Sequence, residues 1–182
     1  MTRTNLAVPL NAQRTTRPAK SRRTAATQLK PTSDGRSNAG NTHISGEMFV
    51  AAELAKRHYS VSLTMGNAKA VDLFAEYKGK AICIQVKAIA RKKSVGWPLP
   101  FQKEKIIDGV MYVCVVLNEI NEPPTYYVMP PHEVRQRGKW YATRAILDLG
   151  KVRNSKFLGA WHLIDKELRK PDQTVRRIAN VT

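Results

Sequence analysis

Apolar and polar residues follow distinct patterns from residue 44 onward, and these patterns predict the order of the secondary structure. A helix is expected to begin near Ile44, with Ser45 as its N-cap. Apolar residues then follow the spacing of one helical face: Met48, Phe49, Ala52, Leu54 and Ala55. Alternation over residues 60–65 predicts a strand, and residues 66–69 predict a turn.

The next apolar segments predict a β-hairpin. Residues 70–77 (AVDLFAEY) and 80–88 (KAICIQVKA) are rich in β-forming residues and flank Lys78 and Gly79. Strand side chains alternate between the two faces of a sheet. We therefore expect each strand of the hairpin to bury one of its faces.

The remaining elements are predicted to complete a mixed sheet. Residues 100–109 favour a short helix ended by glycine, and 110–117 form an apolar run typical of a central strand, often a parallel one. A further strand is expected at 124–129, and a helix with proline in its first turn at 130–138. Residues 159–165 are compatible with a last strand or a packing segment. The order predicts an α/β fold with one domain.

Charge divides the chain of 182 residues into three parts. Residues 1–41 carry eight basic side chains and one acidic side chain, with little apolar periodicity, and are expected to be a disordered basic tail. The folded domain is expected over 42–168, followed by a basic C-terminal tail over 169–182. Three roles are open for the first tail: an arm that contacts phosphates, an organelle transit peptide, or a solubilising leader.

The formal net charge of +17 favours a polyanionic partner, DNA above all. The alternative is a solvated basic surface without a partner. No apolar run approaches the roughly 20 residues of a membrane helix, so no membrane association is expected. We expect a cytoplasmic, nucleoid-associated protein, unless the basic N-terminus directs it to an organelle.

Polar residues gather at the open end of the predicted hairpin. Gln85 and Lys87 point to the same face by alternation, and Asp72 lies about as far before the turn as Gln85 lies after it. Carboxylate and carbonyl oxygens suit Mg²⁺, and a lysine beside such an ion can position water or hold a phosphate. Glu47, on the predicted helix, can add a second carboxylate.

Asp72, the Gln85-Val86-Lys87 segment and the preceding Glu47 resemble the PD-(D/E)XK nuclease superfamily in a Q-x-K variant. The resemblance implies a restriction-endonuclease-like or Holliday-junction-resolvase-like core, ordered αβββαβ. It also implies that Asp72, Gln85 and Glu47 hold Mg²⁺ or alternatively Mn²⁺, and that Lys87 assists the attacking water. One departure from the family matters: Gln85 stands where the family usually has an acid, and its neutral amide binds metal more weakly.

Each of these groups also has a structural interpretation. Asp72 and Lys87 could form a cross-strand salt bridge beside a satisfied Gln85. The loop after the hairpin combines basic side chains with an aromatic ring, a pairing that suits phosphate contact and base stacking. Its candidate nucleic-acid-binding residues are Arg91, Lys92, Lys93, Trp97 and Lys103. The alternative for Trp97 is a place in the core.

The sequence therefore predicts a magnesium-dependent deoxyribonuclease, an endonuclease in particular, that hydrolyses phosphodiester bonds and acts as a homodimer if it cuts both strands. Two alternatives stay open. One is a nucleic-acid-binding protein that has this fold without catalysis. The other is a basic structural protein associated with the nucleoid or the ribosome.

Overall fold

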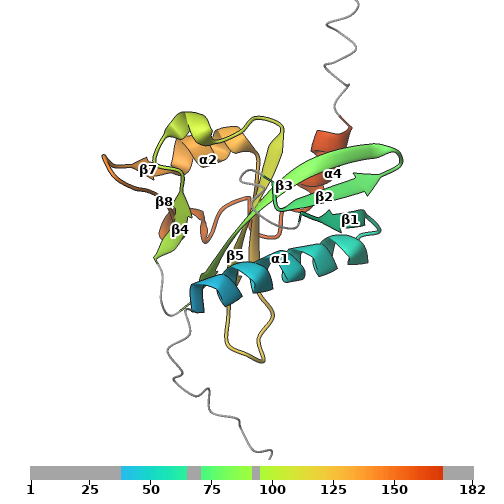
Figure 1. Cartoon of the computed structure of the whole chain (residues 1–182), viewed down its shortest axis with the longest axis horizontal. Coiled ribbons are helices and arrows are strands. Elements are labelled where there is room, and N and C mark those ends of the chain that lie inside the picture. Colours follow the sequence, from blue (N-terminus) through green and yellow to red (C-terminus); the bar gives the residue numbers. More distant parts are fainter. Residues whose placement is uncertain (1–37, 65–70, 92–94, 170–182) are drawn as a thin grey trace, which may run out of the picture. The chain divides into compact units, whose positions relative to one another are not determined.

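A mixed sheet of five strands, in the order β1-β2-β3-β5-β6, forms the centre of the protein (Figure 1). The computed structural model describes residues 38–64, 71–91 and 95–169. The strands are β1 (Ser60–Leu63), β2 (Leu73–Tyr77), β3 (Lys80–Ala90), β5 (Val110–Leu117) and β6 (Thr125–Met129). The long β3 pairs antiparallel with β2 and parallel with β5. The predicted α/β class with a mixed sheet is confirmed.

The hairpin between β2 and β3 has the predicted turn. Tyr77 pairs with Lys80, and the two residues between them have positive φ angles, 52° at Lys78 and 76° at Gly79. Such a two-residue turn matches the twist of the strands it joins. The Gly79 N–H donates to Glu76 Oε1 at 2.6 Å, which helps to offset the cost of the left-handed conformation at Lys78.

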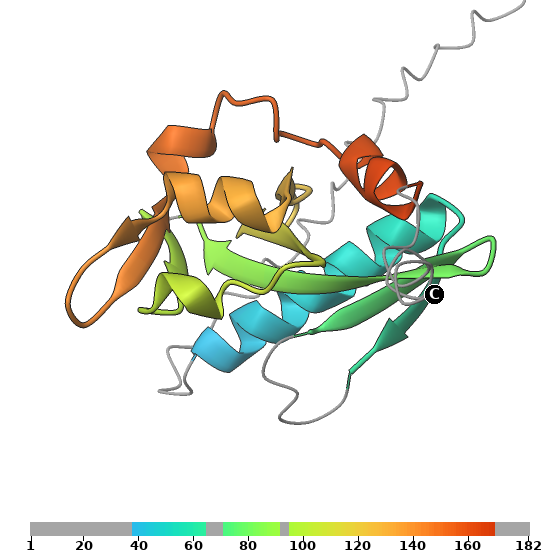
Figure 2. The same ribbon diagram turned by 90° about the horizontal axis from the view of Figure 1, so that it is seen from above.

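Helices α1 (Asn38–Lys56) and α4 (His162–Leu168) cover one face of the sheet (Figure 2). Val50 and Leu54 of α1 are fully buried in the same cluster as Ile84 and Val86 of β3, and Ile164 of α4 joins them. None of the described helices has the length and apolar character that a membrane span requires.

The start of α1 corrects the predicted boundary near Ser45. The helix begins at Asn38, so residues 38–41 belong to it and not to the expected tail. The apolar stripe did not indicate this start because residues 40, 41, 43 and 44 are exposed. The rest of the two predicted tails, residues 1–37 and 170–182, and the predicted turn at 66–69 lie outside the described residues.

A second, smaller sheet covers part of the other face (Figure 1). Its strands are β4 (Gly96–Leu99), β8 (Ala145–Asp148) and β7 (Lys139–Trp140), paired in the order β4-β8-β7. Helix α2 (Pro131–Arg137) and the short α3 (Leu149–Val152) pack beside it. The sequence patterns did not predict this sheet, because its strands have only two to four residues and β4 contains Pro98. Proline is confined to edge strands, where β4 lies.

The structure corrects one further predicted element and decides between the alternatives for another. The helix expected over 100–109 is a single 3₁₀ turn, η1 (Lys103–Lys105), so the parallel crossover from β3 to β5 consists of β4 and this turn. Residues 159–165 are a packing segment and not a strand: a turn over 159–161 leads into α4, and Ala160, Trp161 and Ile164 are buried in the core. The helix predicted at 130–138 is confirmed as α2, with Pro131 in its first turn.

Helix α1 approaches β3 closely at Gly46. A Cβ atom built on Gly46 would lie 2.4 Å from the Cβ atom of Ala88, a distance that real side chains do not tolerate. Because Glu47 follows directly, this contact also sets the height at which Glu47 stands above the sheet. The glycine is thus required by space and not by its backbone angles.

We expect Gly46→Ala to destabilise the protein by about 1–3 kcal/mol, the usual cost of adding a methyl group to a packed contact. Urea denaturation measures the change. Gly40→Ala in the same helix serves as the control and should be neutral or slightly stabilising, because a Cβ atom added at Gly40 would have no atom within 4 Å. Adding Ala88→Gly to Gly46→Ala should recover part of the loss. Equal effects of the two alanine substitutions would contradict the close approach.

Candidate active site

Asp72 lies just before β2 begins and binds the backbone of β3. Its N–H donates to the Ile84 carbonyl oxygen at 2.9 Å, and its carboxylate Oδ2 accepts the Val86 N–H at 2.7 Å. These two backbone groups flank Gln85, so Asp72 lies against β3 at Gln85. The sequence prediction that Asp72 and Gln85 lie near each other at the open end of the hairpin is therefore met by the backbone.

The backbone around Asp72 is also fixed on the β1 side. The Asp72 carbonyl oxygen accepts the Thr64 N–H at 3.0 Å, and the Thr64 hydroxyl donates to the Val71 carbonyl oxygen at 2.6 Å. Asp72 is thus connected to the chain on both sides of β2. A carboxylate held in this way keeps its direction at little further entropic cost.

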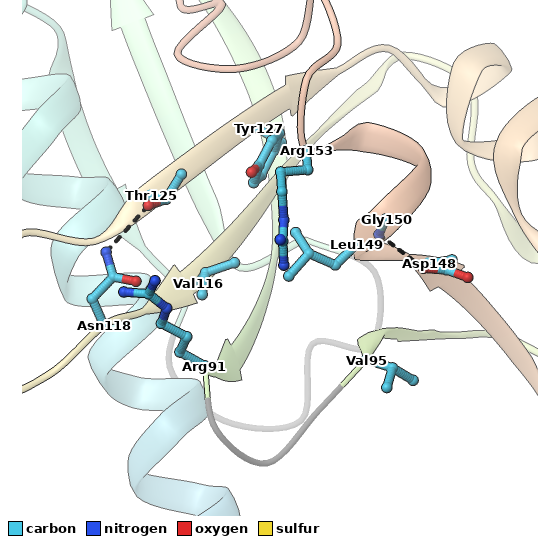
Figure 3. A pocket seen from close by; sticks show the side chains of 10 residues that line it. All are labelled: Arg91, Val95, Val116, Asn118, Thr125, Tyr127, Asp148, Leu149, Gly150 and Arg153. Atoms are coloured by element: carbon cyan, nitrogen blue, oxygen red, sulfur yellow. Dashed lines mark hydrogen bonds between the residues drawn. The ribbon is translucent and has the colours of Figure 1, made fainter.

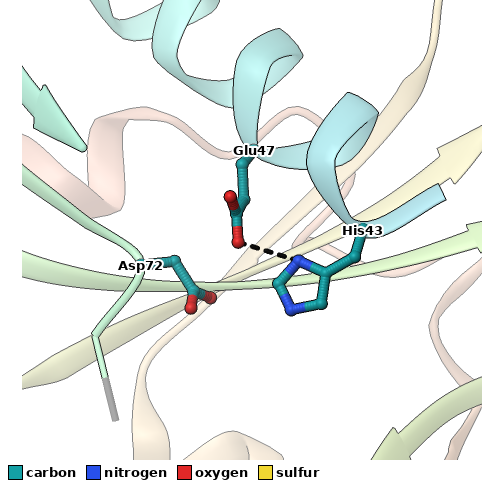
Figure 4. A group of neighbouring side chains, drawn as sticks. All are labelled: His43, Glu47 and Asp72. Carbon is teal, nitrogen blue, oxygen red and sulfur yellow. Dashed lines mark ion pairs between the residues drawn. The ribbon is translucent and has the colours of Figure 1, made fainter. Parts of the chain in front are cut away.

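Glu47 and His43 of α1 complete a cluster with Asp72 (Figure 4). The two helix residues are one turn apart, and His43 Nδ1 lies 2.8 Å from Glu47 Oε1. One ligand atom of each of the three side chains lies within 4.8 Å of the others. Side chains from the helix and from the start of β2 therefore converge on one point.

The electrostatics of the cluster favour a cation. Burial raises the pKa of Glu47 above its ordinary value, the nearby Asp72 carboxylate raises it further, and the contact with His43 opposes both. A raised pKa means that the negative charge of Glu47 is disfavoured where it stands. A positive ion between the two carboxylates would remove that penalty.

The donor set fits a divalent metal ion. Carboxylate oxygens are ligands for Mg²⁺ and Mn²⁺, and imidazole nitrogen is a ligand for several transition metals. Neighbouring ligands at about 2.1 Å from one ion lie about 3 Å apart, so the three atoms, now within 4.8 Å of one another, would close up around it. The other oxygen of Asp72, Oδ1, accepts no hydrogen bond from the described residues and could face such an ion.

His43 is the site residue that sequence reasoning missed. The helix was expected to begin near Ile44 with Ser45 as its N-cap, which left His43 outside it. The signal was the separation of four residues between His43 and Glu47, because residues at i and i+4 lie on the same side of a helix. An earlier helix start would have made this pair visible.

Gln85 and Lys87 lie on the face of β3 that is turned away from α1. Their neighbours on that face, Cys83 and Ile89, pack toward the second sheet. Gln85 is only 7% exposed, whereas Lys87 is partly exposed and stands across from Cys114 of β5. Among the described residues, no side-chain hydrogen bond or ion pair joins either of them to the carboxylates. Their roles therefore stay predictions.

The expected nucleic-acid-binding residues differ in how exposed they are. Trp97 is fully buried, and its Nε1 donates to the Val115 carbonyl oxygen at 2.9 Å. A base-stacking role for Trp97 is therefore wrong, because the ring fills the core between the two sheets. Arg91 and Lys103 are exposed, the former 3.4 Å from Glu122 and the latter over the Trp140 ring. Residues 92–93, which hold the predicted Lys92 and Lys93, lie outside the described residues.

Comparisons with solved structures identify the fold. The chain matches a bacterial homing endonuclease, I-Ssp6803I, with 16% sequence identity and a TM-score of 0.50, over 72% of this chain and 95% of that chain. It also matches Hjc, a Holliday junction resolvase from the archaeal hyperthermophile Archaeoglobus fulgidus, with 16% identity and a TM-score of 0.41, over 61% and 87% of the two chains. No protein-family model matches the sequence, and no curated protein matches it significantly.

The match to the homing endonuclease shows that the chain has a restriction-endonuclease-like fold. This confirms the fold implied by the resemblance that rested on Glu47, Asp72, Gln85 and Lys87. An identity of 16% establishes the fold alone. The chemistry has to be argued from the residues of this chain.

If the cluster binds a divalent ion, Mn²⁺ at 100-fold above its Kd should stabilise the folded protein by about 2.7 kcal/mol, which raises Tm by roughly 5–10 °C for a chain of this size. Asp72→Asn and Glu47→Gln should remove most of that shift, since each neutralises one ligand. Differential scanning fluorimetry with and without Mn²⁺ measures the effect.

Glu53→Gln is the matched control. Glu53 lies on the same helix, its side chain is 19% exposed against 18% for Glu47, and it pairs with Arg57 and Lys56 away from the cluster. Its variant should keep the full Mn²⁺ shift. An identical loss in Glu53→Gln and Glu47→Gln would show that the ion acts on the helix surface in general.

Proposed function

We propose that the protein is a metal-dependent nuclease that hydrolyses phosphodiester bonds in DNA. The observation that carries the proposal is the convergence of the Asp72 and Glu47 carboxylates beside β3, on a fold shared with a homing endonuclease. The formal net charge of +17 supports a polyanionic substrate.

Asp72 and Glu47 act as the metal-holding residues in this proposal. The hydrogen bond from the Val86 N–H orients the Asp72 carboxylate, and the packing of Gly46 on Ala88 sets the distance of Glu47 from it. A divalent ion held there would supply an activated water and neutralise the charge that develops on the phosphate. The protein's contribution is a pair of carboxylates whose positions are fixed before the substrate arrives.

Lys87 is the positively charged residue of the site. Its side chain starts on the face of β3 turned away from α1, so its partly exposed ammonium group would have to reach the scissile phosphate or the attacking water from that side of the strand. Gln85 stands between the two backbone groups that Asp72 binds, and its carbonyl oxygen would act as a neutral ligand if its buried side chain turned toward the ion. Its neutrality leaves Glu47 and Asp72 as the two negative charges near the ion.

His43 can determine which metal ion the site prefers. As a direct ligand, its imidazole favours a transition-metal ion such as Mn²⁺ over Mg²⁺. As a partner of Glu47 only, it orients that carboxylate and leaves the preference unchanged. His43→Gln separates the two roles, because only loss of a direct ligand lowers the advantage of Mn²⁺ over Mg²⁺.

The domain is proposed to extend over 42–168 together with the start of α1, and to act as a homodimer when both strands are cut. Sedimentation of the full chain on a short duplex tests the assembly. A nucleic-acid-binding protein without catalysis is the rival function, and the following variants distinguish it.

Asp72→Asn should abolish cleavage of a DNA duplex in Mg²⁺ or Mn²⁺ while sparing DNA binding. The amide oxygen can still accept the Val86 N–H, so the substitution removes the charge with little change to the hydrogen bond. Lys87→Ala should lower the single-turnover rate about 100-fold or more, the usual effect of removing a positioned electrostatic or proton-transferring group.

Lys80→Ala is the control for Lys87→Ala, since Lys80 is an exposed lysine at the hairpin end of the same strand. Its rate should stay within about twofold of wild type, as for other surface changes away from a site. Cleavage by Asp72→Asn at the wild-type rate would contradict the proposal. Tight DNA binding without cleavage by the wild-type protein in both metals would favour the rival function.

Gln85→Glu tests the departure from the family pattern. The substitution adds one negative charge with almost the same shape, and it should lower the Mg²⁺ concentration needed for half-maximal cleavage if Gln85 faces the ion. A titration of the cleavage rate with Mg²⁺ measures this. An unchanged metal requirement would show that the Gln85 side chain is a structural group of the sheet.

A further inference from the structure

A second candidate site lies at the far end of β3, on the face turned away from α1. A pocket of about 510 Å³ opens there between the ends of β3 and β5, the start of β6 and the segment around α3 (Figure 3). This volume is within the range of pockets that bind small molecules. The proposed nuclease chemistry does not use any residue that lines it.

Two arginines give the pocket a positive charge. Arg91 enters from the end of β3, and Arg153 follows α3 and extends beside Tyr127 (Figure 3). Among the described residues, no acidic side chain pairs with Arg153. Arg91 is 3.4 Å from Glu122, but both side chains are about half exposed or more, so this ion pair is weak.

The acid in the lining, Asp148, has its partners elsewhere. Its Oδ2 accepts from Lys139 Nζ at 3.0 Å, and its Oδ1 accepts the Gly150 N–H at 2.8 Å. Lys139, its backbone contact and Lys151 hold the pKa of Asp148 below its ordinary value. The negative charge of Asp148 is therefore largely balanced by its own neighbours. The positive charges of Arg91 and Arg153 are left without a strong partner in the described residues.

Tyr127 adds a hydrogen-bond donor that lines the pocket. The residue is 3% exposed, and its ring packs edge-on against Trp97 with the centroids 5.5 Å apart. Its hydroxyl binds none of the described residues, although the side chain lines the pocket. Burial raises the pKa of Tyr127, so the hydroxyl stays protonated and can donate to a ligand in the pocket.

Thr125 provides another donor on the same wall. Its Oγ1 accepts a hydrogen bond from Asn118 Nδ2 at 3.2 Å, which leaves the hydroxyl hydrogen of Thr125 to be donated. Asn118 Nδ2 also donates to the Pro123 carbonyl oxygen at 2.7 Å and so fixes the turn between β5 and β6. The wall of the pocket is thus rich in donors on a fixed backbone.

We propose that this pocket binds a phosphate group, with Arg91 and Arg153 as the charged ligands and the Tyr127 hydroxyl as a neutral donor. Guanidinium groups match phosphate oxygens with paired hydrogen bonds, and an added hydroxyl satisfies a third oxygen. The phosphate belongs either to a nucleic-acid strand or to a free nucleotide.

The strand is the source that the fold favours, and this choice rests on the proposed function. Arg91 follows Lys87 by four residues along β3, which is about 13 Å in an extended strand. Phosphates recur every few ångströms along a DNA strand, so the pocket would hold a phosphate within a few nucleotides of the scissile one. It would anchor the strand beside the site of cleavage.

The test measures binding of the full chain to a DNA duplex without divalent ions, by fluorescence anisotropy over a range of salt. Arg153→Gln should weaken binding about tenfold and lower the steepness of the salt dependence by about one phosphate contact. Tyr127→Phe, which removes only the hydroxyl, should weaken binding several-fold with the salt dependence unchanged. Arg169→Gln, at an exposed arginine after α4 outside the pocket, is the matched control and should have neither effect.

A second arm identifies a free nucleotide as the source. Calorimetry with a nucleoside monophosphate and with inorganic phosphate should then show binding to wild type that Arg153→Gln loses, while DNA affinity is the same in both proteins. The proposal is overturned if Arg153→Gln and Tyr127→Phe keep wild-type affinity for DNA, nucleotide and phosphate alike. Because no divalent ion is present, these outcomes do not depend on whether Asp72 supports cleavage.

Discussion

The backbone N–H of Val86 needs a hydrogen-bond acceptor, and the carboxylate of Asp72 provides it. Val86 is fully buried against α1, and an unpaired N–H at such a place would cost about 1–3 kcal/mol. Because β2 begins only at Leu73, no carbonyl oxygen of that strand serves this group. One side chain thus satisfies the backbone of β3 and also lies beside the carboxylate and imidazole of α1.

Asp72 therefore has two roles, one in the stability of the sheet and one in the candidate metal site. The contact of Gly46 with Ala88 brings α1 close enough for Glu47 to stand beside Asp72, at the cost of placing two carboxylates together. The fold tolerates the repulsion because His43 lies against Glu47. A site that is strained without a cation and relaxed with one is well suited to bind one reversibly.

The hairpin, the central strand and the acids could be predicted from sequence because each has a local signal. Lys78-Gly79 marks a two-residue turn, and the unbroken apolar run over 110–117 marks a buried strand. The second sheet could not be predicted, since β7 has two residues and Trp97 is buried by partners from distant strands. His43 was missed because its importance depends on where α1 begins, which no apolar residue indicates.

The two candidate sites also differ in how far apart their parts lie along the chain. The cluster of His43, Glu47 and Asp72 comes with its supporting strand from one stretch, residues 43–88, built from a helix and a meander of neighbouring strands. The pocket of Arg91, Tyr127 and Arg153 closes only after β5 has paired with β3 across a crossover and α3 has packed in place. Local contacts form faster than distant ones. The acidic cluster is therefore expected to assemble early in folding, and the basic pocket is expected to appear only with the complete native chain.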